Sequence, residues 1–399
     1  MFLKNLIKRN KSFVEDVINL HQAGKIPANS YVLDLDTMQK NASIMVDEAK
    51  KHNLKIYAMS KQFGRNPEAF KALAVGGIDS YVAVDMNCAR PIQKAGCKVG
   101  HIGHLVQVAR AEAETAAKMT PDYWTVFSNE KAVEASKASK SIGTTQQLLA
   151  RIYSSGDTFY TGHEGGFRAE DIVSIAEYFD QLSNAAFAGI TTFPALLFNS
   201  ETNKISPTSN LRTLEKAAEA LAASGRNNIE VNAPGTTSSI MMEALAAAGS
   251  TQVEPGHGLT GTTPLHAVSE LPEDPAILYL SEISHFHNGK PYCFGGGMYI
   301  DPVFPPYDVK ALVGSDPETA LINPVSVSIP QPAAIDYYGI IEPDLQNSIH
   351  SGDSVIFGFR VQAFVTRAYI VPISGLSIGK PVVKHIWNSH GQKVAWPEW

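Results

Sequence analysis

One stretch near the start of the chain, Ile56-Tyr57-Ala58-Met59-Ser60-Lys61-Gln62-Phe63-Gly64-Arg65-Asn66-Pro67, sets the pattern for the fold. Its apolar first half has strand character, and Lys61 stands where this run gives way to turn residues. A buried strand that ends in a lysine just before a helix places an amine at one edge of an α/β fold. The ordinary alternative is a solvated lysine at a strand end.

The same alternation of strand and helix continues from about residue 54 to residue 260. Short β-rich runs are followed by longer segments of helical period, which is typical of a parallel sheet wrapped by helices. Eight such units predict an α/β fold of the (β/α)8 TIM-barrel type, whose active face is the C-terminal end of the strands. The eight predicted strands are 54–60, 80–84, 98–105, 123–127, 148–153, 185–193, 228–233 and 251–255.

Beyond residue 264 the sequence becomes rich in Pro, Gly, Tyr and β-branched residues without long helical periods. We therefore expect a barrel domain over 30–264 and a second, mostly β domain over 265–399. The run 31–36 alternates apolar and acidic residues like a half-buried strand, and the barrel already has its eight strands. We expect this run to pair with the β domain, with residues 1–29 packed against it. Strands are predicted at 276–283, 325–329, 354–359 and 362–371.

Composition excludes several classes of function. The formal net charge is −6 and no extended basic stripe is present, which argues against a nucleic-acid partner. No apolar stretch approaches the roughly 20 residues that span a bilayer, and the N-terminus lacks the pattern of a secretory signal. The three cysteines, Cys88, Cys97 and Cys293, are odd in number and lack metal-type spacing. We expect a cytoplasmic protein without a membrane partner.

Two glycine-rich turns follow the last two predicted barrel strands, Asn232-Ala233-Pro234-Gly235-Thr236-Thr237-Ser238 and Glu254-Pro255-Gly256-His257-Gly258. Free backbone NH groups at a helix N-terminus attract anions, and the loops after strands seven and eight often bind phosphate in TIM barrels. A helix cap is the ordinary explanation of the first turn alone. Together with Lys61, the turns suit pyridoxal 5'-phosphate, whose aldehyde forms an aldimine with a lysine while its phosphate is held at the far end.

These motifs resemble those of the fold-type III pyridoxal phosphate enzymes, which include alanine racemase, ornithine racemase and D-threonine aldolase. The likeness is closest to the YhfX-like group of alanine racemase-related proteins. It is carried by residues 60–67, by Gly103-His104-Leu105-Val106-Gln107 and by residues 254–261. The resemblance implies a barrel plus a β domain, an amino-acid substrate, and a homodimer in which the partner's β domain closes the site.

The resemblance also assigns roles to individual residues. Lys61 becomes the aldimine lysine, and the phosphate ligands are Gly235, Thr236, Thr237 and Ser238 beside Asn232, with backbone donors at Gly256 and His257. Arg65 stands where alanine racemases place a phosphate-contacting tyrosine, although a surface arginine is equally ordinary. Arg151 reaches either the phenolic oxygen of the cofactor or a substrate carboxylate, or it is a buried ion-pair partner.

Two positions depart from the alanine racemase pattern. Glu254 stands where an arginine usually lies beside the pyridine nitrogen. A carboxylate there would hold the nitrogen protonated and strengthen the ring as an electron sink, which leaves elimination and aldol cleavage open. Phe193 occupies the place of a ring-stacking histidine, and an ordinary core phenylalanine is the alternative.

Racemisation requires a second acid/base residue, and the sequence does not identify which residue takes this role. The candidates are His104, His285, Tyr292, Cys293 and Tyr299. No metal is expected, because 358–362 lacks the His-x-Cys or His-x-Asp pair of the metal-dependent lyases of this fold, and His285 with His287 lacks a third ligand.

The sequence thus predicts a pyridoxal phosphate-dependent amino-acid racemase that abstracts the substrate α-proton through a Lys61 aldimine. The alternatives are a lyase acting on D-amino acids by aldol cleavage or dehydration, and a non-catalytic protein that only binds the cofactor. A cofactor-free lysine aldolase acting on a sugar phosphate is disfavoured, because its lysine usually lies on a later strand.

Overall fold

The computed structural model describes residues 1–298, 307–322, 324–331, 334–342 and 348–397. They form two compact units that interleave along the sequence. The β unit comprises Met1–Ser43, Lys61–Gly76 and His257–Trp399, and the barrel unit comprises Ile44–Ser60 and Gly77–Gly256. The predicted domain limits at 30–264 and 265–399 stay predictions.

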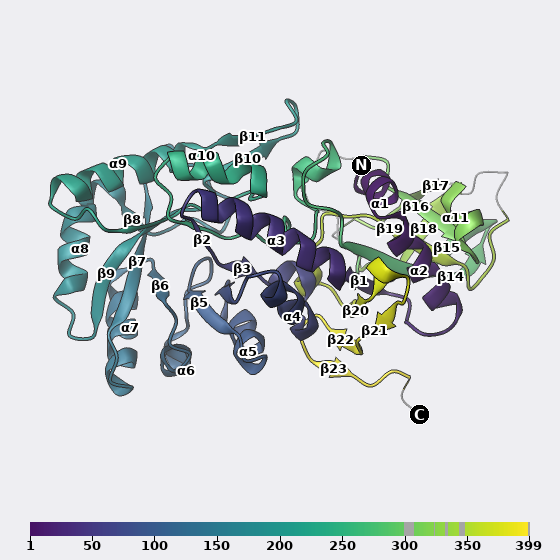
Figure 1. Cartoon of the computed structure of the whole chain (residues 1–399), viewed down its shortest axis with the longest axis horizontal. Helices are drawn as coiled ribbons and strands as arrows, with labels where there is room; N and C mark the ends of the chain where they lie inside the picture. The colour runs from purple at the N-terminus through teal and green to yellow at the C-terminus, as the bar shows by residue number, and fades with distance from the viewer. Residues whose placement is uncertain (299–306, 323, 332–333, 343–347, 398–399) are drawn as a thin grey trace. The chain divides into compact units, whose positions relative to one another are not determined.

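The barrel unit is built on a parallel sheet that turns back on itself (Figure 1). Its strands pair in the order β2-β13-β12-β9-β7-β6-β5-β4-β3. β2 and β3 are consecutive pieces of one extended segment on either side of Tyr57, so the order returns to its start and makes a nearly closed TIM-type barrel. The predicted barrel is confirmed. Its strands are β2 (Lys55–Ile56), β3 (Ala58–Met59), β4 (Ser80–Ala83), β5 (Lys98–Ile102), β6 (Tyr123–Val126), β7 (Gln146–Tyr153), β9 (Ala185–Thr191), β12 (Glu230–Asn232) and β13 (Gln252–Val253), with β8 (Phe167–Arg168) paired to β7.

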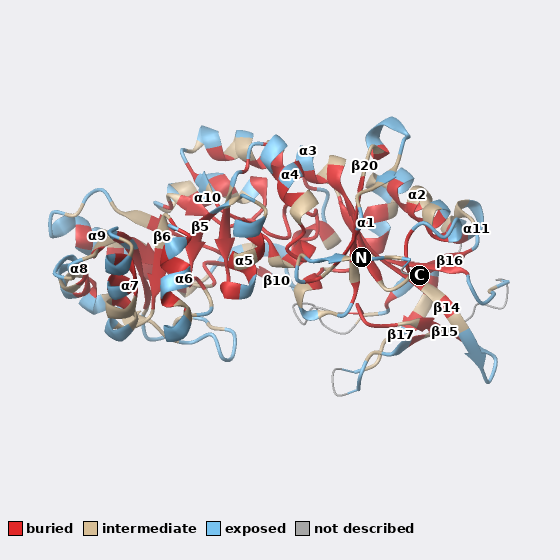
Figure 2. Ribbon diagram, turned by 90° about the horizontal axis from the view of Figure 1, so that it is seen from below, coloured by how far each residue is buried: buried red, intermediate tan, exposed pale blue. Residues whose placement is uncertain are grey.

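One helix of the barrel unit, α7 (Asn129–Ser141), buries only small residues. Its buried positions are alanines and serines, and Ser128 caps the helix by accepting a bond from the NH of Lys131. Figure 2 shows red strands inside and pale blue on the outer faces of the helices. The other helices are α5 (Met86–Lys94), α6 (Ala113–Lys118), α8 (Ile172–Asp180), α9 (Ser209–Ala223) and α10 (Met242–Ala247), with the hairpin β10 (Leu196–Asn199) and β11 (Lys204–Pro207).

Within the residues that the structure describes, the β unit holds an eleven-stranded sheet, and the predicted early strand belongs to it. β1 (Ser30–Asp34) lies between β14 (Ile277–His287), to which it is antiparallel, and β20 (Tyr369–Ser374), to which it is parallel. The pairing expected for this run is therefore confirmed. The other strands are β15 (Lys290–Phe294), β16 (Lys310–Gly314), β17 (Pro324–Ser328), β18 (Tyr338–Glu342), β19 (Ser354–Phe357), β21 (Val382–Val383), β22 (Ile386–Asn388) and β23 (Lys393–Val394).

The N-terminal helices α1 (Phe2–Arg9) and α2 (Lys11–Gln22) pack on this sheet. Leu6, Phe13 and Val17 share one hydrophobic cluster with sheet residues such as Leu280 and Ile356. The remaining helices of the described chain are α3 (Leu35–Lys51), which spans both units, α4 (Pro67–Val75) and α11 (Pro317–Ile322).

The prediction of one strand over 362–371 is wrong. Residues Ala363–Val365 form a 3-10 turn, and β20 begins only at Tyr369. The Thr366 hydroxyl donates to the carbonyl of Ala363, and the NH of Val365 donates to the carbonyl of Gln362. These local bonds take up backbone groups that a strand would share with its neighbours.

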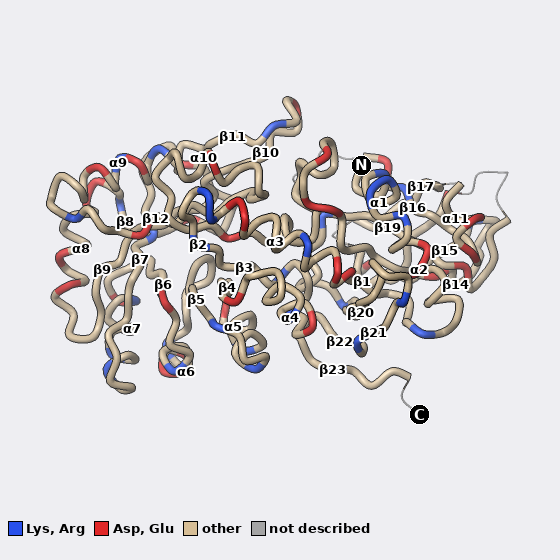
Figure 3. Tube along the Cα trace, in the orientation of Figure 1, with Lys and Arg blue, Asp and Glu red and all other residues tan. Residues whose placement is uncertain are grey.

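Figure 3 shows acidic and basic segments interspersed along both units, in keeping with the modest net charge of −6. Within the described ranges, the helices all fall short of the length and apolar character needed to cross a bilayer.

Candidate functional site

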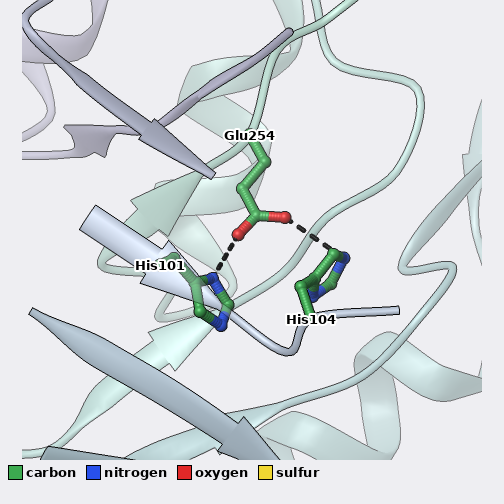
Figure 4. Close-up of side chains that lie close together, drawn as sticks. All are labelled: His101, His104 and Glu254. Carbon is green, nitrogen blue, oxygen red and sulfur yellow. Dashed lines mark hydrogen bonds and ion pairs between the residues drawn. The ribbon is translucent and has the colours of Figure 1, made fainter. Parts of the chain in front are cut away.

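Three buried titratable side chains meet inside the barrel unit: His101, His104 and Glu254 (Figure 4). Nδ1 of His101 lies 2.6 Å from Oε1 of Glu254, and Nε2 of His104 lies 3.2 Å from its Oε2. One ligand-type atom from each of the three side chains lies within 4.8 Å of the other two. The carboxylate therefore lies between two imidazoles, and both contacts are drawn in Figure 4.

The local sequence places these groups at the C-terminal end of the barrel strands. His101 lies in β5, and Gly103 then turns the chain with φ +77° so that His104 follows. A Cβ at Gly103 would lie 2.6 Å from the carbonyl oxygen of Thr125, so a larger residue would disturb this turn. Glu254 directly follows β13. The C-terminal end of the strands is where TIM barrels carry their chemistry.

A hydrogen-bond network orients the carboxylate of Glu254. Nδ2 of Asn232 donates to Oε1 at 3.0 Å, and the Thr191 hydroxyl in turn donates to Oδ1 of Asn232 at 2.8 Å. On the other side, Nε2 of His101 lies 2.6 Å from Oγ1 of Thr125. Burial alone would raise the pKa of Glu254, but His104, His101 and the bond from Asn232 hold the pKa below its usual value. The group is thus a buried carboxylate.

Arg151 is a second buried charge in the barrel unit. It lies on β7 and is 1 % exposed, with Nη2 donating to the carbonyl of His163 at 2.7 Å and its guanidinium 4.7 Å from the Phe127 ring centroid. Desolvation lowers the pKa of Arg151 to about 10. Among the described residues, its Nε and Nη1 have no hydrogen-bond partner. These donors can still bind an anion.

Phe193 contacts both the cluster of His101, His104 and Glu254 and the buried Arg151. Its ring meets the His104 ring edge-on with centroids 5.9 Å apart, and its carbonyl oxygen lies 3.4 Å from Nη2 of Arg151. The Phe193 ring therefore lies beside the polar cluster. Its role toward a cofactor stays a prediction.

The hydroxyl-rich turn after β12 packs on the backbone at Leu196 and keeps one buried hydroxyl, that of Ser238, without a partner among the described residues. A Cβ at Gly235 would lie 2.7 Å from the backbone nitrogen of Leu196, so the chain approaches closely there. The NH of Thr236 bonds the Leu196 carbonyl, and Oγ1 of Thr237 bonds the Gly235 carbonyl. Oγ of Ser238 is buried and has no partner in the described part of the chain. A buried hydroxyl without a partner is costly unless a ligand binds it.

Lys61, Arg65 and His257 are grouped with the β unit. Lys61 directly follows Ser60 in the chain and opens the turn η1 (Lys61–Phe63), and its Nζ lies 5.2 Å from the Phe364 ring centroid. Arg65 is 3 % exposed and donates to the carbonyl of Ser389 at 3.1 Å. A surface position for Arg65 is thus excluded, while its phosphate contact stays a prediction.

His257 is a buried neutral ring. Its Nε2 lies 2.7 Å from the carbonyl oxygen of Val361. Burial, with smaller contributions from Arg360 and Lys61, holds the pKa of His257 well below its usual value. The preceding residue, Gly256, ends the barrel unit. The predicted backbone contacts of both residues with phosphate stay predictions.

The candidates for a second acid/base differ in their surroundings. His104 is buried beside Glu254, whereas His285 is exposed and stacks on Tyr292 with centroids 4.9 Å apart. Cys293 is buried, and burial raises the pKa of this thiol to about 12. Such a thiol is a poor proton acceptor at neutral pH. Tyr299 lies outside the described residues.

His101 and Thr125 were missed by sequence reasoning. A sequence signal was present, because His101 is a titratable residue within the apolar run 98–105 and precedes His104 by three residues. Nothing local indicated that His101 would meet Glu254, which is 153 residues away. The prediction named two of the three clustered residues.

Comparison with known proteins gives the family. The model of the alanine racemase N-terminal domain matches residues 33–264, and that of the YhfX-like C-terminal domain matches residues 278–383. The chain is also 36% identical over 394 residues to the uncharacterized protein YhfX of Escherichia coli (strain K12), covering 99% of this chain and 100% of the relative. The chain belongs to the YhfX-like proteins of the alanine racemase family.

Solved structures with the same fold include several enzymes. The YhfX-like chain resembles D-threonine aldolase from Filomicrobium marinum (TM-score 0.68, 16% identity, 92% and 96% of the two chains) and an alanine racemase of Clostridium difficile 630 in complex with cycloserine (TM-score 0.64, 17%, 92% and 100%). It also resembles D-threo-3-hydroxyaspartate dehydratase from Delftia sp. HT23 (TM-score 0.63, 17%, 90% and 97%). At these identities the likeness shows that the YhfX-like protein shares their fold.

Proposed function

We propose that this YhfX-like protein is a pyridoxal phosphate-dependent amino-acid racemase that removes the α-proton of its substrate. The observation that carries the proposal is an alanine racemase-like barrel whose first strand runs directly into Lys61. An α/β barrel commonly places such a residue at its active face. The expected cytoplasmic location and homodimer belong to the same proposal, and light scattering of the purified chain tests the dimer.

The residues present fit this cofactor. A phosphate needs several donors, and the turn at 235–238 supplies hydroxyl groups, including the buried Oγ of Ser238 that lacks a partner within the described ranges. Arg151 has two guanidinium nitrogens still able to donate to an anionic oxygen. Glu254 is a buried carboxylate, which suits a protonated ring nitrogen.

We assign roles to the residues of this chain accordingly. Lys61 holds the cofactor through its amine and moves the α-proton of the substrate, while Asn232, Gly235, Thr236, Thr237, Ser238, Gly256, His257 and Arg65 bind the phosphate end. Glu254 keeps a proton on the ring nitrogen, and Arg151 binds the phenolic oxygen or the substrate carboxylate. Phe193 limits the space beside the ring. When bound, the cofactor supplies an electron sink for the charge left on the α-carbon.

A lyase is the second candidate function, and Glu254 favours it. A carboxylate in place of arginine strengthens the electron sink and so suits reactions that break a further bond at the substrate. A D-threonine aldolase and a dehydratase have the same fold. Their likeness supports this candidate only at the level of fold.

The binding of the cofactor is tested with the variant Lys61→Ala. Because the amine is the covalent attachment point, we expect the native protein to show the visible band of lysine-bound cofactor and the variant to lose it. After borohydride reduction, mass spectrometry of the native peptide containing Lys61 should show the added cofactor. Lys71→Ala changes an exposed lysine on α4 and should keep the band. A band that survives in Lys61→Ala would refute the assignment.

The reaction type is tested by proton NMR in deuterium oxide with both enantiomers of a panel of amino acids. A racemase exchanges the α-proton and produces the other enantiomer, whereas a lyase releases an aldehyde or a keto acid. A protein that only binds the cofactor gives neither result. Absence of exchange across the panel in cofactor-loaded protein would refute the racemase.

A further inference from the structure

Glu254 is linked through His101 to Thr125, two residues that lie far from it in the sequence. His101 on β5 contacts Thr125 on one side and Glu254 on the other. Its Nε2 lies 2.6 Å from Oγ1 of Thr125 on β6, and its Nδ1 lies 2.6 Å from Oε1 of Glu254, which follows β13. All three side chains are buried. Two consecutive contacts of this length hold the imidazole at both ends, and Figure 4 shows its Nδ1 edge turned to the carboxylate.

These two contacts determine which ring nitrogen of His101 carries a proton. Glu254 is a carboxylate and can only accept, so Nδ1 must donate to Oε1. The Thr125 hydroxyl can donate to a neutral Nε2 or accept from a protonated one. Therefore Nδ1 points its proton at Glu254 in either state of the ring, and Thr125 stabilises that orientation.

The other carboxylate oxygen is left as an acceptor. Oε1 is occupied by His101 and Asn232, whereas Oε2 receives no well-aligned hydrogen bond from the described residues, although His104 lies 3.2 Å away. A carboxylate oxygen has two lone pairs, so the ion pair with His104 leaves Oε2 able to accept a further hydrogen bond. A ligand that brings a protonated ring nitrogen would satisfy it with a charge-assisted bond.

We infer that His101 is a positioning residue. It is supported by Thr125 and holds Glu254 so that Oε2 accepts a hydrogen bond from a protonated aromatic nitrogen of the bound ligand. This inference rests on the proposed function, in which that nitrogen belongs to pyridoxal phosphate. His101 itself acts only through Glu254. The competing interpretation, a divalent metal bound by His101, His104 and Glu254, is an outcome of the test below.

The first measurement uses the full chain without added cofactor. With histidine labelled by ¹⁵N, we expect a low-field imidazole proton on Nδ1 that is absent in both His101→Phe and Glu254→Gln. Its presence in either variant would overturn the inference. This readout reports the contact itself and does not depend on activity.

The second measurement is the affinity for pyridoxal phosphate, from titration of the visible band. Loss of a hydrogen bond to a charged group costs a factor of about 10 to 100. We expect His101→Phe to weaken binding by about that factor, and Thr125→Val by less. His101→Asn carries an amide donor in the place of Nδ1 and should restore most of the affinity. Such rescue would not occur if the ring only filled space.

His266 offers a matched control in the β unit. It is also fully buried, with Nδ1 2.6 Å from the Thr263 hydroxyl and Nε2 3.7 Å from Glu273. His266→Phe should leave cofactor affinity unchanged, which separates a positioning effect from general damage to folding. If His101→Phe binds the cofactor as tightly as the native chain, the inference is wrong while the proposed function stands.

Two further results are decisive. If the native chain gives no visible band at any cofactor concentration, the proposed function is wrong. The inferred contact between Oε2 of Glu254 and the cofactor's ring nitrogen is then also wrong. If the native chain binds one Zn²⁺ tightly and both His101→Phe and His104→Ala abolish that binding, the cluster is a metal site and the positioning role of His101 is overturned.

Discussion

Two glutamates of the barrel unit, the half-buried Glu230 and the buried Glu254, lie at opposite ends of their strands. Glu230 lies at the start of β12, where it bonds Lys55, Tyr123, Thr251 and Gln252, whereas Glu254 lies beyond the end of β13. In TIM barrels the N-terminal ends of the strands serve stability and the C-terminal ends carry chemistry. Glu230 and Glu254 lie at the two ends that this division separates, the first at the start of β12 and the second after β13.

The substitution Glu230→Gln tests the structural role through its pH dependence. Burial alone would raise the pKa of Glu230, but its hydrogen bonds, led by that from Lys55, lower the pKa to about 2. A lowered pKa stabilises the fold above the unfolded value of 4.5, and this contribution disappears as the pH falls toward 2. At pH 7 we expect a loss of about 1–2 kcal/mol in urea unfolding, allowing for partial exposure.

The same difference in unfolding free energy should shrink steadily below pH 4.5. Glu243→Gln, at an exposed position on α10, serves as the control and should change little at any pH. A pH-independent difference between native protein and Glu230→Gln would contradict the assignment.

At the scale of elements, the segment after Lys61 is held by a helix cap. Asn66 precedes α4, and its Oδ1 accepts from the NH groups of Glu68 and Ala69 at 2.9 and 3.2 Å, with Pro67 in the first helical turn. The turn containing Lys61 therefore ends at a well-defined helix start. The Asn-Pro pair signals that start in the sequence, whereas the burial of Asn66 does not follow from it.

Replacing Asn66 by alanine should lower the unfolding free energy by about 1 kcal/mol, because two helix NH groups lose their acceptor. Asn66→Ser keeps a capping oxygen and should recover much of the loss. Thermal unfolding followed by circular dichroism measures both. Equal stability of the alanine and serine variants would show that the cap contributes nothing.

At the scale of the whole molecule, the ends of the chain depend on each other. The first helices and the last strands share one hydrophobic cluster in the β unit, in which Phe13 and Val371 are fully buried. Neither end can bury its apolar face alone, so the β unit forms only when residues more than 300 positions apart come together.

The variant Phe13→Ala should therefore destabilise the β unit by about 3–5 kcal/mol, the usual cost of removing a large buried side chain. Calorimetry should show the transition of the β unit at a lower temperature. Ser12→Ala changes the exposed neighbour and should leave it in place. If Phe13→Ala unfolds like the native protein, the helices do not contribute to this core.

The sequence by itself determined the features that repeat locally. Strand and helix periods revealed the barrel, and the residue types at strand ends singled out Lys61, Glu254 and His104, because side-chain spacing within one element depends on nearby residues. The same reasoning gave a wrong prediction at 362–371. There the chain forms a 3-10 turn at Ala363–Val365, with a bond from the Thr366 hydroxyl to the Ala363 carbonyl, before β20 begins.

Only the tertiary structure decided which strand ends face one another. The contact of His101 with Glu254, its support by Thr125, and the insertion of β1 between β14 and β20 all join segments distant in sequence. Such contacts depend on strand order and register around a closed sheet, which no local period encodes. The sequence therefore shows which residues carry chemical groups, and the closure of the barrel determines which of those groups meet.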